Sequence, residues 1–202
     1  MENETLIDSG CVALARSVAQ GFEVLLARRS PKVSMAPDHW VFPGGTVEAC
    51  DREGAQNSYR RAAMREAFEE VAAPIPSVEQ LIDFAHWVTP SFFPKRYRTY
   101  FYLLPIEPFE PVVDGVEIVE TIWLSPQDAL SKQGQGELDL MFPTAALLDW
   151  MSDFQRLDAL IARLQQRPLP MVCPTLGYEG GRRYLAIDPS AGYRLQRWFI
   201  DR

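Results

Sequence analysis

The sequence predicts a mixed α/β domain, and three features of the chain carry that prediction. Residues 97–106 form an aromatic and apolar run of the kind that enters β-strands. Residues 55–72 place Ala63, Ala67 and Val71 at helical spacing, with acidic side chains on the other side. Hydrophobic residues make up 47% of the 202 residues, which is enough for one packed core. We therefore treat residues 1–202 as a single domain.

The first part of the chain is predicted to form short strands around one helix. Residues 11–18 and 22–28 are expected to pair as a hairpin across Ala19-Gln20-Gly21. Residues 41–47 place a Gly-Gly turn between short extended pieces, and residues 55–72 form the main helix. Further strands are predicted over 81–88, 97–106 and 115–124.

The second part is predicted to be helical and then extended. Ser125 caps a helix that has Pro126 at its first position. Helical patterns follow over 144–151 and 154–165, and Arg167-Pro168-Leu169-Pro170 breaks the chain. Two strands, which could form a hairpin, are predicted over 184–187 and 194–200.

The most informative motif joins Pro43-Gly44-Gly45 to an acidic helix about twenty residues later. A Gly-Gly turn lets the backbone approach a ligand closely. Glu66, Glu69 and Glu70 are three and four residues apart, so their carboxylates lie on one side of a helix. Because like charges at that spacing destabilise a helix, a hard cation such as Mg²⁺ or Mn²⁺ is the natural partner.

These residues resemble the signature of the Nudix hydrolases, Gly-x5-Glu-x7-Arg-Glu-U-x-Glu-Glu-x-Gly-U, where U is aliphatic. Gly45 opens the motif, Asp51 stands in place of its first Glu, and Arg65 begins its closing half. Two departures are six extra residues between Asp51 and Arg65, and Ala72 in place of the closing Gly. We expect residues 52–57 to form an exposed loop, because surface loops tolerate insertions at small entropic cost.

The resemblance implies an α/β/α sandwich with a mixed sheet over about residues 8–135. Residues 136–202 are then expected to form a helical and hairpin extension packed on that core. It also implies hydrolysis of a pyrophosphate bond, in which a metal ion neutralises charge and activates water while a carboxylate takes the proton.

By the same resemblance, Glu66, Glu69 and Glu70 hold the metal ion together with the Gly45 carbonyl. Arg65 is expected to pair with Asp51, or with a helix carboxylate, and so to fix the helix against the loop. The general base is left open between Glu66 and a carboxylate further along the chain. Glu117 and Glu120 are the candidates there, and their opposite strand parity lets only one face the site.

A second resemblance concerns the substrate. Residues 25–45 are similar to the motif of coenzyme A diphosphatases within this family, with Ala27, Ser34 and Asp38 as departures. Residues 35–45, 87–90 and 96–101 resemble the peroxisomal branch of these enzymes. Coenzyme A or an acyl derivative is therefore the first substrate hypothesis. ADP-ribose or a dinucleotide is the second, and a nucleotide-sensing module without catalysis is the third.

Four arginines are candidate phosphate ligands, because guanidinium groups suit phosphate geometry. The alternative for each is a solvated surface charge. The candidates are Arg28, Arg29, Arg96 and Arg98.

Composition narrows the partners and the location. The formal net charge of −7 disfavours binding to a nucleic-acid backbone. Cys11, Cys50 and Cys173 lie far apart, which argues against a zinc site or a disulfide framework. With no long apolar run, we expect neither a signal peptide nor a membrane partner, and a cytoplasmic protein. A homodimer is left open.

Overall fold

A computed structural model describes residues 6–53 and 57–201 of the chain. Among these residues, the main sheet has eight strands, with the order β3-β2-β1-β6-β5-β8. β4 also pairs with β1, and β7 also pairs with β2. The strands are β1 (Ile7–Val18), β2 (Gly21–Arg29), β3 (Trp40–Val41), β4 (Gly44–Thr46), β5 (Ile82–Val88), β6 (Tyr97–Pro105), β7 (Ile118–Leu124) and β8 (Met171–Val172).

The sheet is mixed, and its central pair is parallel. β1 runs parallel to β6 and antiparallel to β2 and β4. β4 contains the Gly-Gly segment. β5 is antiparallel to β6 and parallel to the short β8. β1 thus pairs with β4 through residues 9–11 and with β2 through residues 15–18, and β7 pairs with β2.

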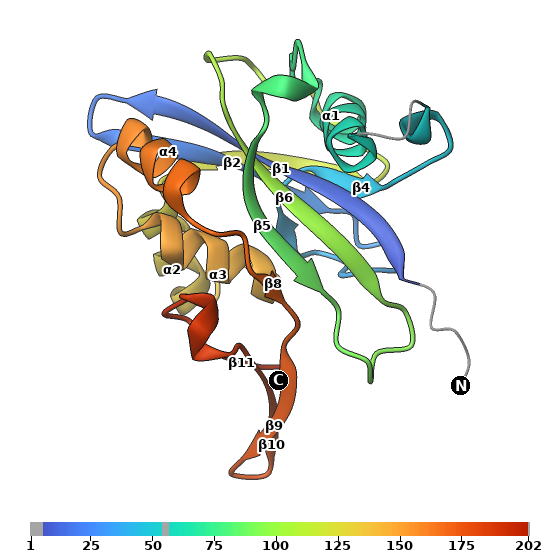
Figure 1. Cartoon of the computed structure of the whole chain (residues 1–202), viewed down its shortest axis with the longest axis vertical. Helices are drawn as coiled ribbons and strands as arrows, with labels where there is room; N and C mark the ends of the chain where they lie inside the picture. Colours follow the sequence, from blue (N-terminus) through green and yellow to red (C-terminus); the bar gives the residue numbers. More distant parts are fainter. Residues whose placement is uncertain (1–5, 54–56, 202) are drawn as a thin grey trace.

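Helices cover both faces of this sheet (Figure 1). α1 (Ser58–Val71) lies on one face, and α2 (Pro126–Gln135), α3 (Phe142–Met151) and α4 (Leu157–Gln166) lie on the other. Val12 and Leu14 pack toward α1, whereas Ala13 and Ala15 pack toward the other helices. This alternation buries both faces of β1, and it confirms the predicted α/β/α sandwich.

The last part of the chain adds a second, three-stranded antiparallel sheet in the described residues, with the order β11-β10-β9. These strands are β9 (Thr175–Glu179), β10 (Arg182–Ala186) and β11 (Arg197–Phe199), and they project from the body of the molecule (Figure 1). The C-terminal extension is part of the hydrophobic core, because α3, α4 and β8 contribute to the same apolar cluster as the main sheet.

Several predicted boundaries differ from the structure. β1 begins at Ile7, four residues before the predicted start, and the strands β8 and β9 were not predicted. α4 begins at Leu157, after the predicted start at Phe154. β7 begins only at Ile118, because the Asp114 carboxylate accepts hydrogen bonds from the N–H groups of Glu117 and Ile118 and holds a turn there.

The main helix begins at Ser58 rather than at residue 55. Residues 54–56, which are half of the predicted inserted loop over 52–57, lie outside the described residues. At the other end Ala72 has a left-handed backbone, with φ of 54° and ψ of 34°. Its N–H donates to the Phe68 carbonyl at 2.9 Å, so Ala72 takes the capping conformation that glycine usually supplies.

Candidate active site

Three glycines bring β1, β4 and α1 into close contact. A Cβ atom on Gly10 would lie 2.0 Å from the Tyr59 carbonyl oxygen of α1. Gly44 has a φ of +150°, and a Cβ there would lie 2.4 Å from the Gly10 carbonyl oxygen. A Cβ on Gly45 would lie 2.4 Å from the Glu66 carboxyl carbon. At Gly10 and Gly44 the close atoms are backbone, so only glycine fits there, and at Gly45 the acidic helix lies directly against the Gly-Gly segment.

Glu70 is the most deeply buried carboxylate of the motif, with 3% of the residue exposed. Its Oε2 accepts a hydrogen bond of 2.9 Å from the Gly44 N–H. Burial raises the pKa of Glu70 to about 8, although the Gly44 hydrogen bond opposes the rise, and the negative charges of Glu66 and Glu117 add to it. Among the described residues, the charge of Arg29 favours the ionised form of Glu70, but it does not offset the effect of burial.

Glu66 shares this environment on the preceding turn of α1. Its side chain is 13% exposed, and its Oε1 lies 3.1 Å from Arg65 Nη1. Burial raises the pKa of Glu66 despite the attraction of Arg65, and the charges of Glu69 and Glu117 raise it further. Because Glu117 acts on both Glu66 and Glu70, these three carboxylates form one electrostatically coupled group.

Glu69 does not join this group in the way the sequence analysis expected. Its side chain is 56% exposed, and its Oε2 lies 2.9 Å from Arg65 Nη1. Across residues 6–53 and 57–201, no three His, Cys, Asp or Glu side chains gather closely enough to hold a metal ion. Glu66, Glu69 and Glu70 therefore do not converge on one point in this structure, because Arg65 draws Glu69 outward while Gly44 holds Glu70 inward, and their role as metal ligands stays a prediction.

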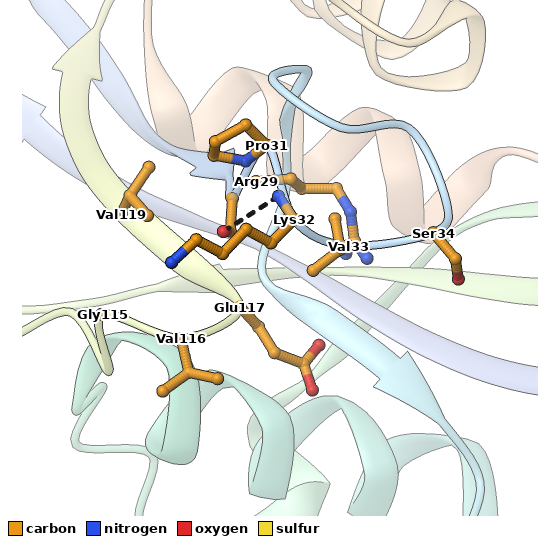
Figure 2. A pocket seen from close by; sticks show the side chains of 10 residues that line it. Arg29, Pro31, Lys32, Val33, Ser34, Gly115, Val116, Glu117 and Val119 are labelled. Carbon is orange, nitrogen blue, oxygen red and sulfur yellow. Dashed lines mark hydrogen bonds between the residues drawn. The ribbon is translucent and has the colours of Figure 1, made fainter.

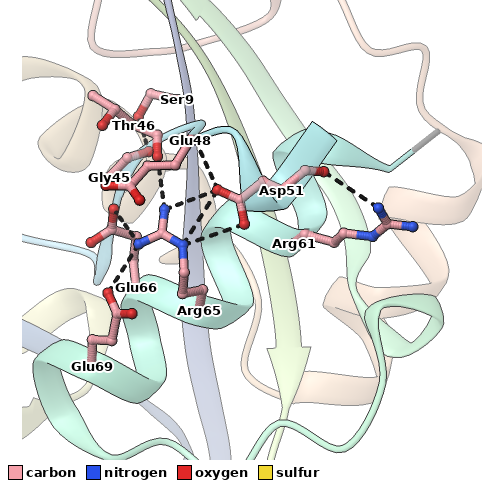
Figure 3. A network of polar contacts seen from close by, with 9 residues as sticks. All are labelled: Ser9, Gly45, Thr46, Glu48, Asp51, Arg61, Arg65, Glu66 and Glu69. Atoms are coloured by element: carbon pink, nitrogen blue, oxygen red, sulfur yellow. Dashed lines mark hydrogen bonds and ion pairs between the residues drawn. The ribbon is translucent and has the colours of Figure 1, made fainter. Parts of the chain in front are cut away.

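Arg65 links the helix to the loop that follows β4 (Figure 3). Its Nη2 donates to Asp51 Oδ2 at 2.9 Å and to the Thr46 carbonyl at 2.9 Å. Asp51 is 3% exposed and also accepts from the Glu48 N–H. The expected pairing of Asp51 with Arg65 is present, so the longer connection between them does not separate loop from helix.

Glu117 and Glu120 have different partners, although they are three residues apart. Glu120 Oε2 lies 3.1 Å from Arg28 Nε, and the two residues are opposite each other on β7 and β2. Glu117 precedes β7 and lines a cavity of about 640 Å³ together with Arg29 and Lys32 (Figure 2). Of the two candidates for the general base, Glu117 is the one whose charge acts on Glu66 and Glu70. Glu120 forms an ion pair with Arg28.

The remaining arginine candidates also differ. Arg29 donates from Nε to the Met35 carbonyl at 2.9 Å, and its charge acts on Glu70. Arg98 donates to Asp8 Oδ1 at 2.7 Å, and Arg96 donates to the Thr89 carbonyl at 3.0 Å. Arg29 is thus the candidate that lies beside both the acidic group and the cavity.

Sequence reasoning missed two residues that shape this site. Gly10 interrupts an apolar strand, which is a sequence signal for close backbone approach. Ser9 is 6% exposed, and its hydroxyl donates to the Gly45 carbonyl at 2.8 Å. No sequence signal marks Ser9, because its role depends on the pairing of β1 with β4.

The donor set suits a hard divalent cation. The carboxylates of Glu66, Glu70 and Glu117 repel one another, and Gly45 lies directly against the Glu66 carboxylate. Oxygen ligands and excess negative charge are what Mg²⁺ and Mn²⁺ prefer. The chemistry of these groups therefore fits the cation that the sequence resemblance implies, whereas no three of the acidic side chains among the described residues are gathered around one point.

Two general properties follow from the described residues. None of their helices is long and apolar enough to span a membrane. Cys11, Cys50 and Cys173 are not joined in disulfides.

Comparisons with known proteins identify the family of this fold. The NUDIX domain family matches residues 9–144. A Caenorhabditis elegans protein named "Putative nudix hydrolase 7" is 26% identical over 171 residues, covering 67% of this chain and 57% of that relative. The chain thus spans a little over half the length of this curated relative.

Solved structures show the same fold. A NUDIX hydrolase from Alicyclobacillus acidocaldarius superposes with a TM-score of 0.72 at 20% identity, covering 79% of this chain and 97% of that one. The NUDIX domain of Shewanella oneidensis NrtR, solved with ADP ribose, gives a TM-score of 0.57 at 17% identity, with coverage of 74% and 88%. The family match covers more than half of the chain, and the chain therefore belongs to the NUDIX domain family.

Proposed function

We propose that this protein hydrolyses the pyrophosphate bond of a nucleoside diphosphate derivative with the help of a divalent cation. The observation that carries the proposal is the coupled group of Glu66, Glu70 and Glu117 beside Gly44 and Gly45. Two of these carboxylates are shielded from solvent, and the third opens into a cavity large enough for a ligand. The family membership supports the same reaction class.

Each residue has a distinct role in this proposal. Glu66, Glu70 and the Gly45 carbonyl would hold Mg²⁺ or Mn²⁺, and Glu69 is a further candidate ligand. A bound cation neutralises phosphate charge and lowers the pKa of water. Glu117 is the best-placed general base, because it is exposed to the cavity and negatively charged, whereas Glu70 is buried. Arg65 positions Glu66 and ties it to Asp51.

Coenzyme A or an acyl derivative remains the first substrate hypothesis. The support is the motif over residues 25–45, whose loop, from Arg29 to Ser34, lines the cavity. ADP-ribose is the alternative, since the NrtR domain of the same fold was solved with it. That likeness has 17% identity and supports the fold, so the coenzyme A motif of this chain carries more weight.

The test is hydrolysis of a panel of compounds: coenzyme A, ADP-ribose, NADH and diadenosine polyphosphates. We expect coenzyme A to give 3′,5′-ADP and phosphopantetheine with Mg²⁺ or Mn²⁺, and EDTA to abolish turnover. Full turnover in EDTA would contradict the role of the cation. Binding without hydrolysis of any of these compounds would instead favour a nucleotide-sensing module.

A further inference from the structure

We infer that Lys32 binds a phosphate group of the substrate on the wall of the cavity that faces away from α1. This inference rests on the proposed function, and it names the residue that binds the anionic part of the substrate. Lys32 lines the 640 Å³ cavity from the loop after β2, and Glu117 lines it from the segment before β7 (Figure 2). The cavity thus has both a cationic and an acidic wall.

The loop holds Lys32 in a defined place. The Val33 N–H donates to the Ser30 carbonyl at 3.2 Å, and the Lys32 N–H donates to the Ser30 hydroxyl at 3.3 Å. The Ser30 N–H donates to the Glu117 carbonyl at 2.7 Å, which ties the two walls of the cavity together. The backbone of Lys32 is therefore ordered before a ligand arrives, and only its side chain has to adjust.

Arg29 and Lys32 are the two cations that line the cavity. Arg29 donates from Nε to the Met35 carbonyl, and its charge acts on Glu70. In the described part of the chain, the Lys32 ammonium group makes no ion pair, hydrogen bond or ring contact. The carboxylates at Glu66, Glu70 and Glu117 would repel any phosphate that no cation neutralises. The Lys32 ammonium group would supply the positive charge that stabilises a phosphate in this cavity.

The same cavity also fits an organic phosphate better than a free one. Val33, Val116 and Val119 line it beside Lys32, and Val116 is 71% exposed. A ligand with an apolar portion next to its phosphate would cover these side chains. Coenzyme A meets this description, whereas ADP-ribose carries a polar ribose on each phosphate, and the two serve as contrasting probes.

The experiment compares Lys32→Ala and Lys32→Arg with the wild-type protein, with coenzyme A and ADP-ribose as probes at saturating Mg²⁺. We expect Lys32→Ala to raise KM by about tenfold, the scale of a lost charge-assisted hydrogen bond, with kcat within about twofold. Lys32→Arg should keep KM near the wild-type value. Added KCl should raise the wild-type KM more than the KM of Lys32→Ala.

The matched control is Lys132→Ala, which removes the same charge from α2, where Lys132 pairs with Glu137. An equal KM for wild type, Lys32→Ala and Lys132→Ala overturns the inference and leaves the proposed hydrolysis intact. If the wild type binds a probe without hydrolysing it, isothermal titration replaces kinetics. A weaker Kd for Lys32→Ala then supports Lys32 even though the proposed reaction fails, and an unchanged Kd overturns it.

Discussion

Arg28 and Arg29 are consecutive residues of β2, yet they belong to different faces of the sheet. Arg28 lies opposite Glu120 and pairs with it, on the side where Leu26 packs toward α3. Arg29 lies opposite Ile118, whose side chain packs toward α1. The register between β2 and β7 shifts between these two residues. A bulge at this point turns one end of the strand pair toward the acidic helix.

The difference shows how a sheet selects among chemically equal candidates. Glu117 and Glu120 are both carboxylates of one segment, and the two arginines are adjacent guanidinium groups. Glu117 and Arg29 lie with Glu66 and Glu70 on the face toward α1, whereas Arg28 and Glu120 form an ion pair with each other. The two faces should therefore respond differently to the same substitution.

The largest expected effect separates Glu117 from Glu120. Glu117→Gln should lower kcat by at least about a hundredfold, because general-base catalysis contributes about 10²–10⁴ in rate. Glu120→Gln is the matched control, and its kcat should change by less than about threefold. Glu120 pairs with Arg28 away from the acidic group, and loss of this half-exposed pair should hardly change the stability of the fold. Steady-state kinetics with the substrate identified by the panel measures both. Equal losses in the two variants would refute the assignment of the faces.

A second effect separates Glu70 from its neighbour Glu69. The pKa of Glu70 in the folded protein, about 8, exceeds its ordinary value of 4.5, so the folded state binds the proton more tightly than the unfolded state. In EDTA the free energy of unfolding should therefore fall as the pH rises from about 4.5 toward 8. Glu70→Gln should remove part of this loss, since a glutamine cannot ionise.

Thermal melting in EDTA at pH 5.5 and pH 8 measures this effect. The decrease in Tm between the two pH values should be smaller by several degrees in Glu70→Gln than in the wild type. Glu69→Gln is the control, because Glu69 is 56% exposed and should change the pH dependence much less than Glu70→Gln does. Adding Mg²⁺ at pH 8 should raise the wild-type Tm more than that of Glu70→Gln. Parallel curves for all three proteins would falsify the buried-acid interpretation.

The smallest expected effect concerns the end of α1, away from the acidic group. Ala72→Gly should raise the free energy of unfolding by about 0.5–1 kcal/mol, because the left-handed conformation costs an alanine more than it costs a glycine. Urea unfolding measures this change. The kcat should stay within about twofold, because the Ala72 side chain is not part of the site. A destabilised variant would show that Ala72 has packing contacts that outweigh its backbone strain.

Much of the site could be predicted from local sequence. The Gly-Gly turn and the acidic spacing of α1 depend on backbone freedom and helix period, which are properties of neighbouring residues. The pairing of Asp51 with Arg65 also came from a motif, and the structure has it at 2.9 Å. The strands whose residues alternate or are strongly apolar, such as β2 and β6, were expected within about one residue of their bounds.

Other features depend on residues distant in sequence, so local patterns could not give them. β8 has two residues, too few for a periodicity to mark, and it pairs with β5, whereas the five residues of β9 gain their hydrogen bonds from β10. The outward turn of Glu69 follows from the position of Arg65, which in turn depends on the loop after β4.

The sequence by itself determined the family, the α/β class and the carboxylates available for a cation, because these depend on residue identity and local spacing. The tertiary structure decided which carboxylates meet. Close packing at Gly10 brings α1 against β1, burial raises the pKa of Glu70, and the bulge between β2 and β7 sends Glu117 and Glu120 to different partners. Desolvation and strand register arise only when distant segments pack together, and for that reason the sequence left both open.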